Sequence, residues 1–427
     1  MKNNKAQQNI PTGWQVIRVG SLGFAYNGLK SKRKADFGHG KPYITYMNIF
    51  TNSKIDPKQV DYVEIDKSEN QNAVKYGDVF FTVSSETPEE VGTSSVLLDE
   101  IDDLYLNSFC FGFRLNNFKQ LLPEYAIFLF RGNDFRSQIV KMAQGSTRFN
   151  LSKERVLSLS LLLPEITEQK RIAEILGTVD EEIAKTQEVI GAAEKLKRGL
   201  MQQLFTRGIG HTKFKETKIG QIPEEWGVVS IRNSSIKLID GDRGANYPKQ
   251  GDFSPEGFCL FLSAKNVSKN GFIFNEVSFI SQEKDRVLRK GRLERGDIIL
   301  TSRGTVGNVA YYDEKIPFDH VRINSGMLIV RHGAHFDPVF LYRYFSGPQM
   351  EAKYSSMGSG SAQPQLPVGS LEQVEIPLMP ISEQKEIANI ISAVNEKITV
   401  NKKLKEKLTI LKKGLMNDLL SGRVRVL

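Results

Sequence analysis

One stretch of this sequence occurs twice, and the repeat constrains the fold more than any other feature of the chain. The segment KLKRGLMQQLFTRG begins at Lys195, and ILKKGLMNDLLSGR begins at Ile410, 215 residues further on. The same spacing matches the triplet EQK at residues 168–170 to a second EQK at residues 383–385. No gap is needed between these points, so two copies of one structural plan follow each other along the chain.

The parts that precede these segments repeat less strictly. GSTRFNL at residues 145–151 matches GSAQPQL at residues 360–366, again 215 residues apart, whereas YGDVFFT and RGDIILT are 219 residues apart. The front of each copy therefore tolerates insertions and the back does not. We divide the 427 residues into four segments, with globular domains over 1–160 and 211–375 and helical regions over 161–210 and 376–427.

The two kinds of segment differ in their hydrophobic pattern. The globular segments contain short β-like runs, such as DVFFTV, DIILTS and GMLIVR, between turns rich in Gly, Asn and Ser. The helical segments repeat apolar residues at three- and four-residue steps, which is close to a heptad. Thr167 and Ser382 stand where the N-cap of each helix is expected.

A helix of about 40 residues is about 60 Å long, and a narrow apolar stripe on it cannot be buried by the helix alone. We favour an antiparallel pairing of the two helices over the alternative, in which each helix packs separately on its own globular domain. The predicted fold class is α+β, with two globular domains separated by two long antiparallel α-helices in a pseudo-twofold internal repeat.

Gly199 and Gly414 occupy the same place in the two predicted helices. Each should cost about 1 kcal/mol relative to alanine in a helix interior. Two interpretations stay open. The glycines are either tolerated kinks or early helix ends, or they form a notch where another backbone docks.

Charge and composition restrict the partners and the location of the chain. The formal net charge is +9 and the pI is about 9.2, which permits a polyanionic partner without requiring one. No apolar run reaches the roughly 20 residues of a membrane span. The N-terminus, MKNNKAQQNI, lacks the apolar core of a signal peptide, and the two cysteines form no disulfide framework. We expect a cytoplasmic protein.

Catalytic and metal-binding motifs are not evident in the sequence. There is no phosphate-binding loop of the G-x-x-x-x-G-K-[ST] type and no dinucleotide-binding turn. His332 and His335 form an H-x-x-H without a third ligand nearby, so we predict no metal site. The EQK triplets are similar to the end of a nuclease signature, but a glutamate at a helix start is explained better by the helix dipole.

Several loops combine basic side chains with glycine, Asn, Gln or hydroxyl residues. They are LKSKRK, DGDRGANYPKQGDF, LSAKNV, TSRGTVG and the two Gly-Ser loops. Arg, Lys, Asn and Gln can read base edges, while Ser and Thr suit phosphates. Any one loop could be ordinary solvated surface, but the loops recur in both copies. The predicted DNA-binding residues are Lys30, Lys32, Arg33, Lys34, Ser146, Thr147, Arg148, Arg243, Lys249, Lys265, Asn266, Arg303, Ser361 and Gln363.

Taken together, these segments resemble the specificity (S) subunit of type I restriction-modification enzymes. The resemblance rests on IPEEWGVV, RGDIILTSRGTVG, the Gly-Ser loops ending in Leu, the ITEQKRIA and ISEQKEIA segments, and the twin K-x-G-L-M. It covers nearly the whole chain. It implies that each globular segment is a target recognition domain that reads one half of a bipartite site in double-stranded DNA. It also implies that the helices set the spacer and dock two modification (methyltransferase) subunits.

The resemblance further implies a chain that is not catalytic and binds no cofactor itself. S-adenosylmethionine, ATP and Mg would belong to the modification and restriction subunits. The docking surface would include Gly199, Leu200, Met201, Gly414, Leu415 and Met416. Two other classes stay open, namely a nuclease or methyltransferase with unusual motifs and a scaffold or adhesin built on the coiled coil. Activity of the purified chain would favour the first, and absence of salt-dependent DNA binding would favour the second.

Overall fold

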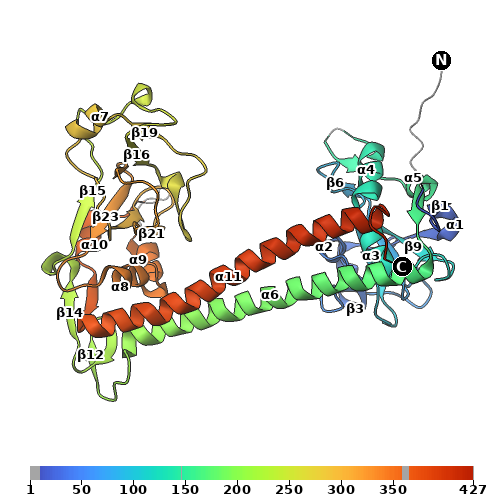
Figure 1. Cartoon of the computed structure of the whole chain (residues 1–427). Coiled ribbons are helices and arrows are strands. Elements are labelled where there is room, and N and C mark those ends of the chain that lie inside the picture. Colours follow the sequence, from blue (N-terminus) through green and yellow to red (C-terminus); the bar gives the residue numbers. More distant parts are fainter. Residues whose placement is uncertain (1–9, 146, 358–364, 427) are drawn as a thin grey trace. The chain divides into compact units, whose positions relative to one another are not determined.

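The chain folds into two compact units, each of which contains one globular part. The computed structural model describes residues 10–145, 147–357 and 365–426. Unit 1 consists of Met1–Gln187 with Lys403–Leu427, and unit 2 consists of Glu188–Lys402. Two long helices, α6 (Ile166–Arg207) and α11 (Ile381–Leu420), each contribute one half to either unit (Figure 1). None of the helices in the described ranges is long and apolar enough to cross a bilayer.

Unit 1 is built from short strands and short helices around the first half of α6. The strands are β1 (Gln15–Arg18), β2 (Gly23–Asn27), β3 (Phe37–Ile44), β4 (Val60–Val63), β5 (Val79–Thr82), β6 (Ser84–Ser85), β7 (Ser94–Val96), β8 (Tyr105–Leu106), β9 (Cys110–Leu115), β10 (Phe149–Asn150) and β11 (Ser160–Leu163). The helices are α1 (Val19–Leu22), α2 (Tyr46–Thr51), α3 (Pro123–Leu129), α4 (Asn133–Met142) and α5 (Lys153–Ser158).

Unit 2 has the corresponding larger sheets and two additional hairpins, β12-β13 and β17-β18. The strands are β12 (Phe214–Thr217), β13 (Gly220–Pro223), β14 (Gly227–Ser230), β15 (Lys237–Asp240), β16 (Cys259–Leu262), β17 (Val267–Ser268), β18 (Gly271–Phe272), β19 (Phe279–Ile280), β20 (Ile298–Thr301), β21 (Val309–Tyr311), β22 (Val321–Ile323), β23 (Met327–Arg331) and β24 (Glu375–Leu378). The helices are α7 (Gln282–Val287), α8 (Pro338–Phe345), α9 (Pro348–Met357) and α10 (Val368–Glu372).

The sheets of the two units have the same strand order. The four-stranded sheet is β2-β9-β5-β7 in unit 1 and β15-β23-β20-β21 in unit 2, and all its neighbours are antiparallel. The three-stranded sheets are β4-β3-β8 and β19-β16-β22, each with one parallel pair. The pairs β1-β11 and β14-β24 also correspond. The internal repeat predicted from the sequence is therefore confirmed.

The predicted strand runs form the centre of each four-stranded sheet. The runs DVFFTV and DIILTS contain β5 and β20, and all four residues of each strand are buried. β-Branched and aromatic side chains fill both faces of such a strand, which explains why neither run alternates between apolar and polar residues.

Each helix begins in the core of one unit and ends in the core of the other. α6 places Ile172 in the core of unit 1 and Leu204 and Phe205 in the core of unit 2. α11 does the reverse, with Ile387 in the core of unit 2 and Leu419 in the core of unit 1. Each globular part is thus completed by the start of its own helix and the end of the other helix.

Polar contacts in each unit follow an antiparallel register. In unit 1, Lys412 Nζ lies 2.5 Å from Asp180 Oδ1, and Lys405 Nζ donates to Gln187 Oε1 at 2.7 Å. From the first of these contacts to the second, the residue number rises by seven on α6 and falls by seven on α11, so the two helices run in opposite directions here. In unit 2, Lys197 Nζ donates to Asn395 Oδ1 at 2.7 Å, continuing the same sense. The predicted fold class is confirmed, and the packing of helix ends on the globular parts accompanies the helix pairing instead of replacing it.

The predicted N-caps are wrong by about two residues. α6 begins at Ile166 and α11 at Ile381, so Thr167 and Ser382 lie inside the first turns. The backbone oxygens of Glu165 and Pro380 accept the first helical hydrogen bonds instead. Each helix thus starts almost as soon as the preceding prolines permit.

Candidate nucleic-acid interface

A buried glutamate at the start of α6 holds unit 1 together. Trp14 Nε1 donates to Glu168 Oε2 at 3.0 Å, and Arg425, which follows α11, donates from Nε to Glu168 Oε1 at 2.8 Å. Burial raises the pKa of the Glu168 carboxyl. The hydrogen bonds from Arg425, Val426 and Trp14 outweigh that effect and leave the pKa below its usual value. The carboxylate therefore joins the first strand region, the start of one helix and the end of the other.

Unit 2 repeats this arrangement with a histidine in place of the arginine. Trp226 Nε1 donates to Glu383 Oε2 at 2.9 Å, and Ile209 N donates to Glu383 Oε1 at 3.0 Å. The His211 ring, which follows α6, places Nε2 at 2.9 Å from the same oxygen. The sequence interpretation of the two EQK glutamates as helix-start charges was therefore incomplete. Each one accepts long-range hydrogen bonds that tie its helix to the segment after the other helix.

The glutamine that follows each glutamate is a second buried anchor. Gln169 Oε1 accepts from Leu122 N at 3.0 Å, and its Nε2 donates to Gln120 O at 2.8 Å and Pro164 O at 3.0 Å. Gln384 makes the same three bonds to residues 337, 335 and 379, and each partner lies 215 residues after its counterpart. Both glutamines are fully buried. They fix how each globular part sits on its helix.

A buried ion pair supports the four-stranded sheet of each unit. Arg114 donates from Nε and Nη2 to Asp78, at 2.9 and 2.6 Å, and these hydrogen bonds raise the pKa of the Arg114 guanidinium. Arg331 and Asp297 repeat the contact at 2.8 and 2.7 Å. Each pair is bidentate and is matched in the other unit, which indicates a structural role.

The predicted DNA-binding residues of unit 1 lie at two places. Lys30, Arg33 and Lys34 are exposed on the loop before β3, whereas the Lys32 side chain is largely buried and paired with Glu69. Thr147 and Arg148 are exposed on the loop after α4. Lys32 is therefore occupied within the unit. Ser146 lies outside the described residues.

The predicted residues of unit 2 are spread over several loops. Arg243 Nη2 lies 2.9 Å from Asp240 Oδ2, and the Arg243 side chain is about half exposed. Lys265 Nζ lies 3.6 Å from Glu276 Oε2, and both of these side chains are exposed. Lys249 and Arg303 are also exposed. Such solvent-exposed pairs are weak and can open when a phosphate approaches.

Asn266 does not fit its predicted role as a base reader. It is 4% exposed, and its Nδ2 donates to Ile273 O at 3.1 Å and to Glu276 O at 2.7 Å. Asn48 makes the equivalent bonds in unit 1. The prediction rested on the residue type and on the recurrence of such loops, whereas the fold assigns Asn266 to holding its own loop. Ser361 and Gln363 lie outside the described residues.

The predicted docking residues divide into two groups. Gly199 and Gly414 are exposed, and a Cβ atom built on either would meet no atom within 4 Å. Both helices continue past them, so the early helix end is wrong, and no neighbouring backbone of the described chain occupies the notch. The other residues turn inward. Met201 is buried in the core of unit 2, and the partly buried residues are Leu200 against that core and Leu415 and Met416 against the core of unit 1.

Exposed apolar side chains accompany each glycine, and the sequence reasoning missed them. In unit 2, Val189 and Leu196 are 40% and 55% exposed. In unit 1, Leu404 and Leu411 are 45% and 50% exposed, and each lies 215 residues after its counterpart. A seven-residue step keeps both members on one face of the helix. We call these two places the outer faces. An apolar residue off the buried stripe, repeated at the 215-residue spacing, is the signal that could have revealed them.

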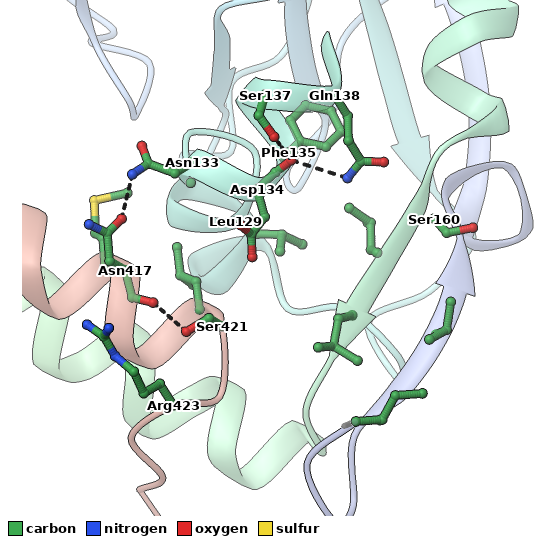
Figure 2. Close-up of a pocket in the computed structure, with 17 residues that line it drawn as sticks. Leu129, Asn133, Asp134, Phe135, Ser137, Gln138, Ser160, Asn417, Ser421 and Arg423 are labelled. Atoms are coloured by element: carbon green, nitrogen blue, oxygen red, sulfur yellow. Dashed lines mark hydrogen bonds between the residues drawn. The ribbon is translucent and has the colours of Figure 1, made fainter. Parts of the chain in front are cut away.

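A hollow of about 810 Å³ lies in unit 1 between α4, β11 and the last turns of α11 (Figure 2). Asn133 Nδ2 donates to Asn417 Oδ1 at 2.6 Å, and Ser421 Oγ donates to Asn417 O at the same distance. These polar groups form hydrogen bonds with one another. Among the described residues, no cluster of three or more His, Cys, Asp or Glu side chains could hold a metal ion.

Comparison with known proteins points in one direction. The family model described as the type I restriction modification DNA specificity domain matches residues 11–192 and 223–409. A Methanocaldococcus jannaschii protein bearing the name type I restriction enzyme MjaX specificity subunit is 30% identical over 431 residues, covering 98% of this chain and 95% of its own. The MjaVIII specificity subunit of the same organism is 29% identical over 307 residues, 70% of either chain. The solved S subunit from M. genitalium superposes with a TM-score of 0.57, at 17% identity and 97% coverage of each chain, and supports the fold.

Proposed function

Because this chain belongs to the family of type I restriction-modification specificity subunits, we propose that its two globular domains read the two halves of a bipartite site in double-stranded DNA. The family membership confirms the resemblance inferred from the sequence, and the chain is a specificity subunit instead of a catalytic one. We further propose that the paired helices carry two modification subunits and set the spacer between the half-sites. S-adenosylmethionine, ATP and Mg would enter with the partner subunits.

The proposal that the helices carry two modification subunits rests on the repetition of the outer faces. Val189, Leu196 and Gly199 recur as Leu404, Leu411 and Gly414, and all six are exposed. Exposed apolar residues at matched positions are typical of protein-binding surfaces. Two like surfaces on a pseudo-twofold body suit two copies of one partner.

The loops of the globular domains support DNA binding. Lys30, Arg33 and Arg148 in unit 1 and Arg243 and Arg303 in unit 2 present basic side chains at the surface. The two domains have one fold but different loop residues, which would allow each to recognise a different half-site. Side chains on loops can vary while the buried sheet and its ion pair stay the same.

Sequencing of methylated DNA tests the function directly. We expect the chain co-expressed with its modification subunits to direct methylation to a split motif, and the purified chain alone to transfer no methyl groups. Methylation by the pure chain would favour the enzyme alternative. A complex without sequence preference would refute the assignment of the globular domains.

Leu411→Asp tests docking on the outer face of unit 1. A carboxylate in the centre of an apolar contact is costly to desolvate, so we expect the variant to retain fewer modification subunits on size exclusion. Thr409→Asp is the matched control because it adds the same charge at an exposed position of the same helix. Thr409 precedes Leu411 by two residues, so its side chain points about 200° away from that of Leu411 around the helix axis. Equal assembly of both variants would remove the outer face from the proposal, and Leu196→Asp repeats the test in unit 2.

A further inference from the structure

Unit 2 contains a basic hollow that the functional assignment does not use. It has a volume of about 490 Å³ and lies beside the segment between α7 and β20. Six cationic and two anionic side chains line it, namely Arg286, Arg289, Lys290, Arg292, Arg322 and Arg331 with Asp285 and Glu294. The excess of positive charge in a concave surface attracts anions.

Half of these cations are neutralised by carboxylates within the unit. Arg322 Nε donates to Asp285 Oδ1 at 2.5 Å, and Arg292 pairs with the same buried carboxylate. Arg331 lies 2.7 Å from Asp297, in the ion pair already described. These residues hold the walls of the hollow and have little capacity for another anion.

The other half face solvent without such partners. Arg286, Arg289 and Lys290 are exposed, and none of them forms a salt bridge with a residue that the structure describes. The pKa of Asp242 is lowered by the hydrogen bond from Gly244 N and, to a smaller extent, by the charge of Arg289, so Arg289 is the most compensated of the three. Three adjacent cations repel one another, so an external anion that approaches all three is favoured. The hollow therefore has a surplus of positive charge directed outward.

The backbone keeps this segment in place beside the loop after β15. Asp242, which is 5% exposed, accepts from Arg289 N at 2.7 Å and from Gly244 N at 2.8 Å. A Cβ atom on Gly244 would lie 2.7 Å from Arg289 Nη2, so the guanidinium rests against that glycine. Arg243 belongs to the same loop, so a predicted DNA-binding residue adjoins the hollow.

The matching place in unit 1 has a different chemistry. The 219-residue spacing aligns residues 286–292, with four basic and no acidic residues, to residues 67–73, with one of each. There, Gln71 donates to Lys30 O at 2.9 Å and accepts from Lys30 N at 3.0 Å, and Glu69 pairs with Lys32. Neutral amides and an internal ion pair thus fill the position that is cationic in unit 2.

We propose that Arg286, Arg289 and Lys290 bind the phosphate backbone of DNA beside the half-site read by unit 2, and that unit 1 has no equivalent contact. This inference rests on the proposed function. Phosphate contacts position a protein on a duplex without reading its sequence. The two recognition domains then differ in kind as well as in sequence preference, with unit 2 supplying a salt-sensitive contact.

The test uses the complex with modification subunits and a duplex carrying its methylated motif. Affinity is measured between 50 and 200 mM salt for the native chain and for the combined Arg286→Gln, Arg289→Gln and Lys290→Gln variant. Three lost phosphate contacts lower the slope of log K against log salt by about 2.7. When the salt rises from 50 to 200 mM, the affinity of both complexes falls. The factor by which it falls should be about 40 times larger for the native complex than for the variant. The methylated motif should not change.

Two controls separate this effect from others. Lys213→Gln, Lys215→Gln and Lys218→Gln remove the same charge from exposed positions in and beside the β12–β13 hairpin of unit 2 and should leave the slope close to native. Changing Arg286 and Arg289 to lysine keeps the charge and should keep the slope.

Each other outcome overturns the inference. An unchanged slope in the glutamine variant excludes phosphate binding at the hollow, an altered motif indicates base reading, and loss of modification subunits indicates an acidic protein partner. If the native complex does not prefer its motif, the proposed function fails instead, so the two failures are distinguishable.

Discussion

Replacing Gln169 with leucine should loosen unit 1 and leave unit 2 intact. The two side chains have similar volumes, so the change mainly removes hydrogen bonds. Gln169 is fully buried and satisfies the N–H of Leu122 and the carbonyls of Gln120 and Pro164. A buried polar group left without a partner costs about 1–3 kcal/mol. Three such groups predict a loss of at least about 3 kcal/mol.

Native-state hydrogen exchange resolves this loss by unit. A loss of about 3 kcal/mol in the opening free energy accelerates exchange by about 100-fold. We expect that acceleration at buried amides of unit 1, including those near Ile172, and little change around Ile387 in unit 2. The variant Gln384→Leu should produce the opposite distribution because Gln384 makes the equivalent bonds in unit 2.

Gln187→Leu provides the control for the chemical change itself. Gln187 is exposed and accepts one hydrogen bond, from Lys405 Nζ. Its replacement should alter stability by no more than about 0.5 kcal/mol. The reasoning is refuted if Gln169→Leu behaves like this control, or if either buried variant accelerates exchange equally in both units.

Three further predictions concern titration, thiol reactivity and packing. The pKa of Glu168 is lowered in the folded chain, so its contribution to the free energy of unfolding is present above about pH 4.5 and is lost as the pH falls through the folded pKa. Denaturation measured across pH 2–6 should therefore show a free energy of unfolding that depends less steeply on pH in Glu168→Gln than in the native chain. Burial raises the pKa of the Cys110 thiol to about 12 and that of the Cys259 thiol to about 11, so alkylation followed by mass spectrometry at pH 8 should label neither until the chain unfolds. Gly112→Ala would place a Cβ atom 2.2 Å from Tyr26 Cζ, and a thermal melt should show destabilisation of about 1–3 kcal/mol; an unchanged melting temperature would contradict that packing.

Some features of this protein depended on local sequence alone. The apolar runs DIILTS and GMLIVR form β20 and β23, because β-branched side chains favour extended backbone wherever they can be buried. The three- and four-residue steps predicted helices that the structure places at Ile166–Arg207 and Ile381–Leu420. The repeat predicted two copies of one fold. Each of these properties is repeated along the chain and needs no knowledge of distant neighbours.

Contacts between distant residues decided the rest. Arg425 Nε lies 2.8 Å from Glu168 Oε1 although the two residues are 257 positions apart in the sequence, and no periodicity links them. Asn266 has the residue type of a base reader, but long-range packing buries it. The run of basic residues from Arg286 to Arg292 is visible in the sequence, yet only folding brings Asp285 to Arg322 and Arg292 and leaves three cations facing solvent. Periodicity shows which side chains share a face of an element, whereas tertiary packing determines which face is covered and which charges are already paired.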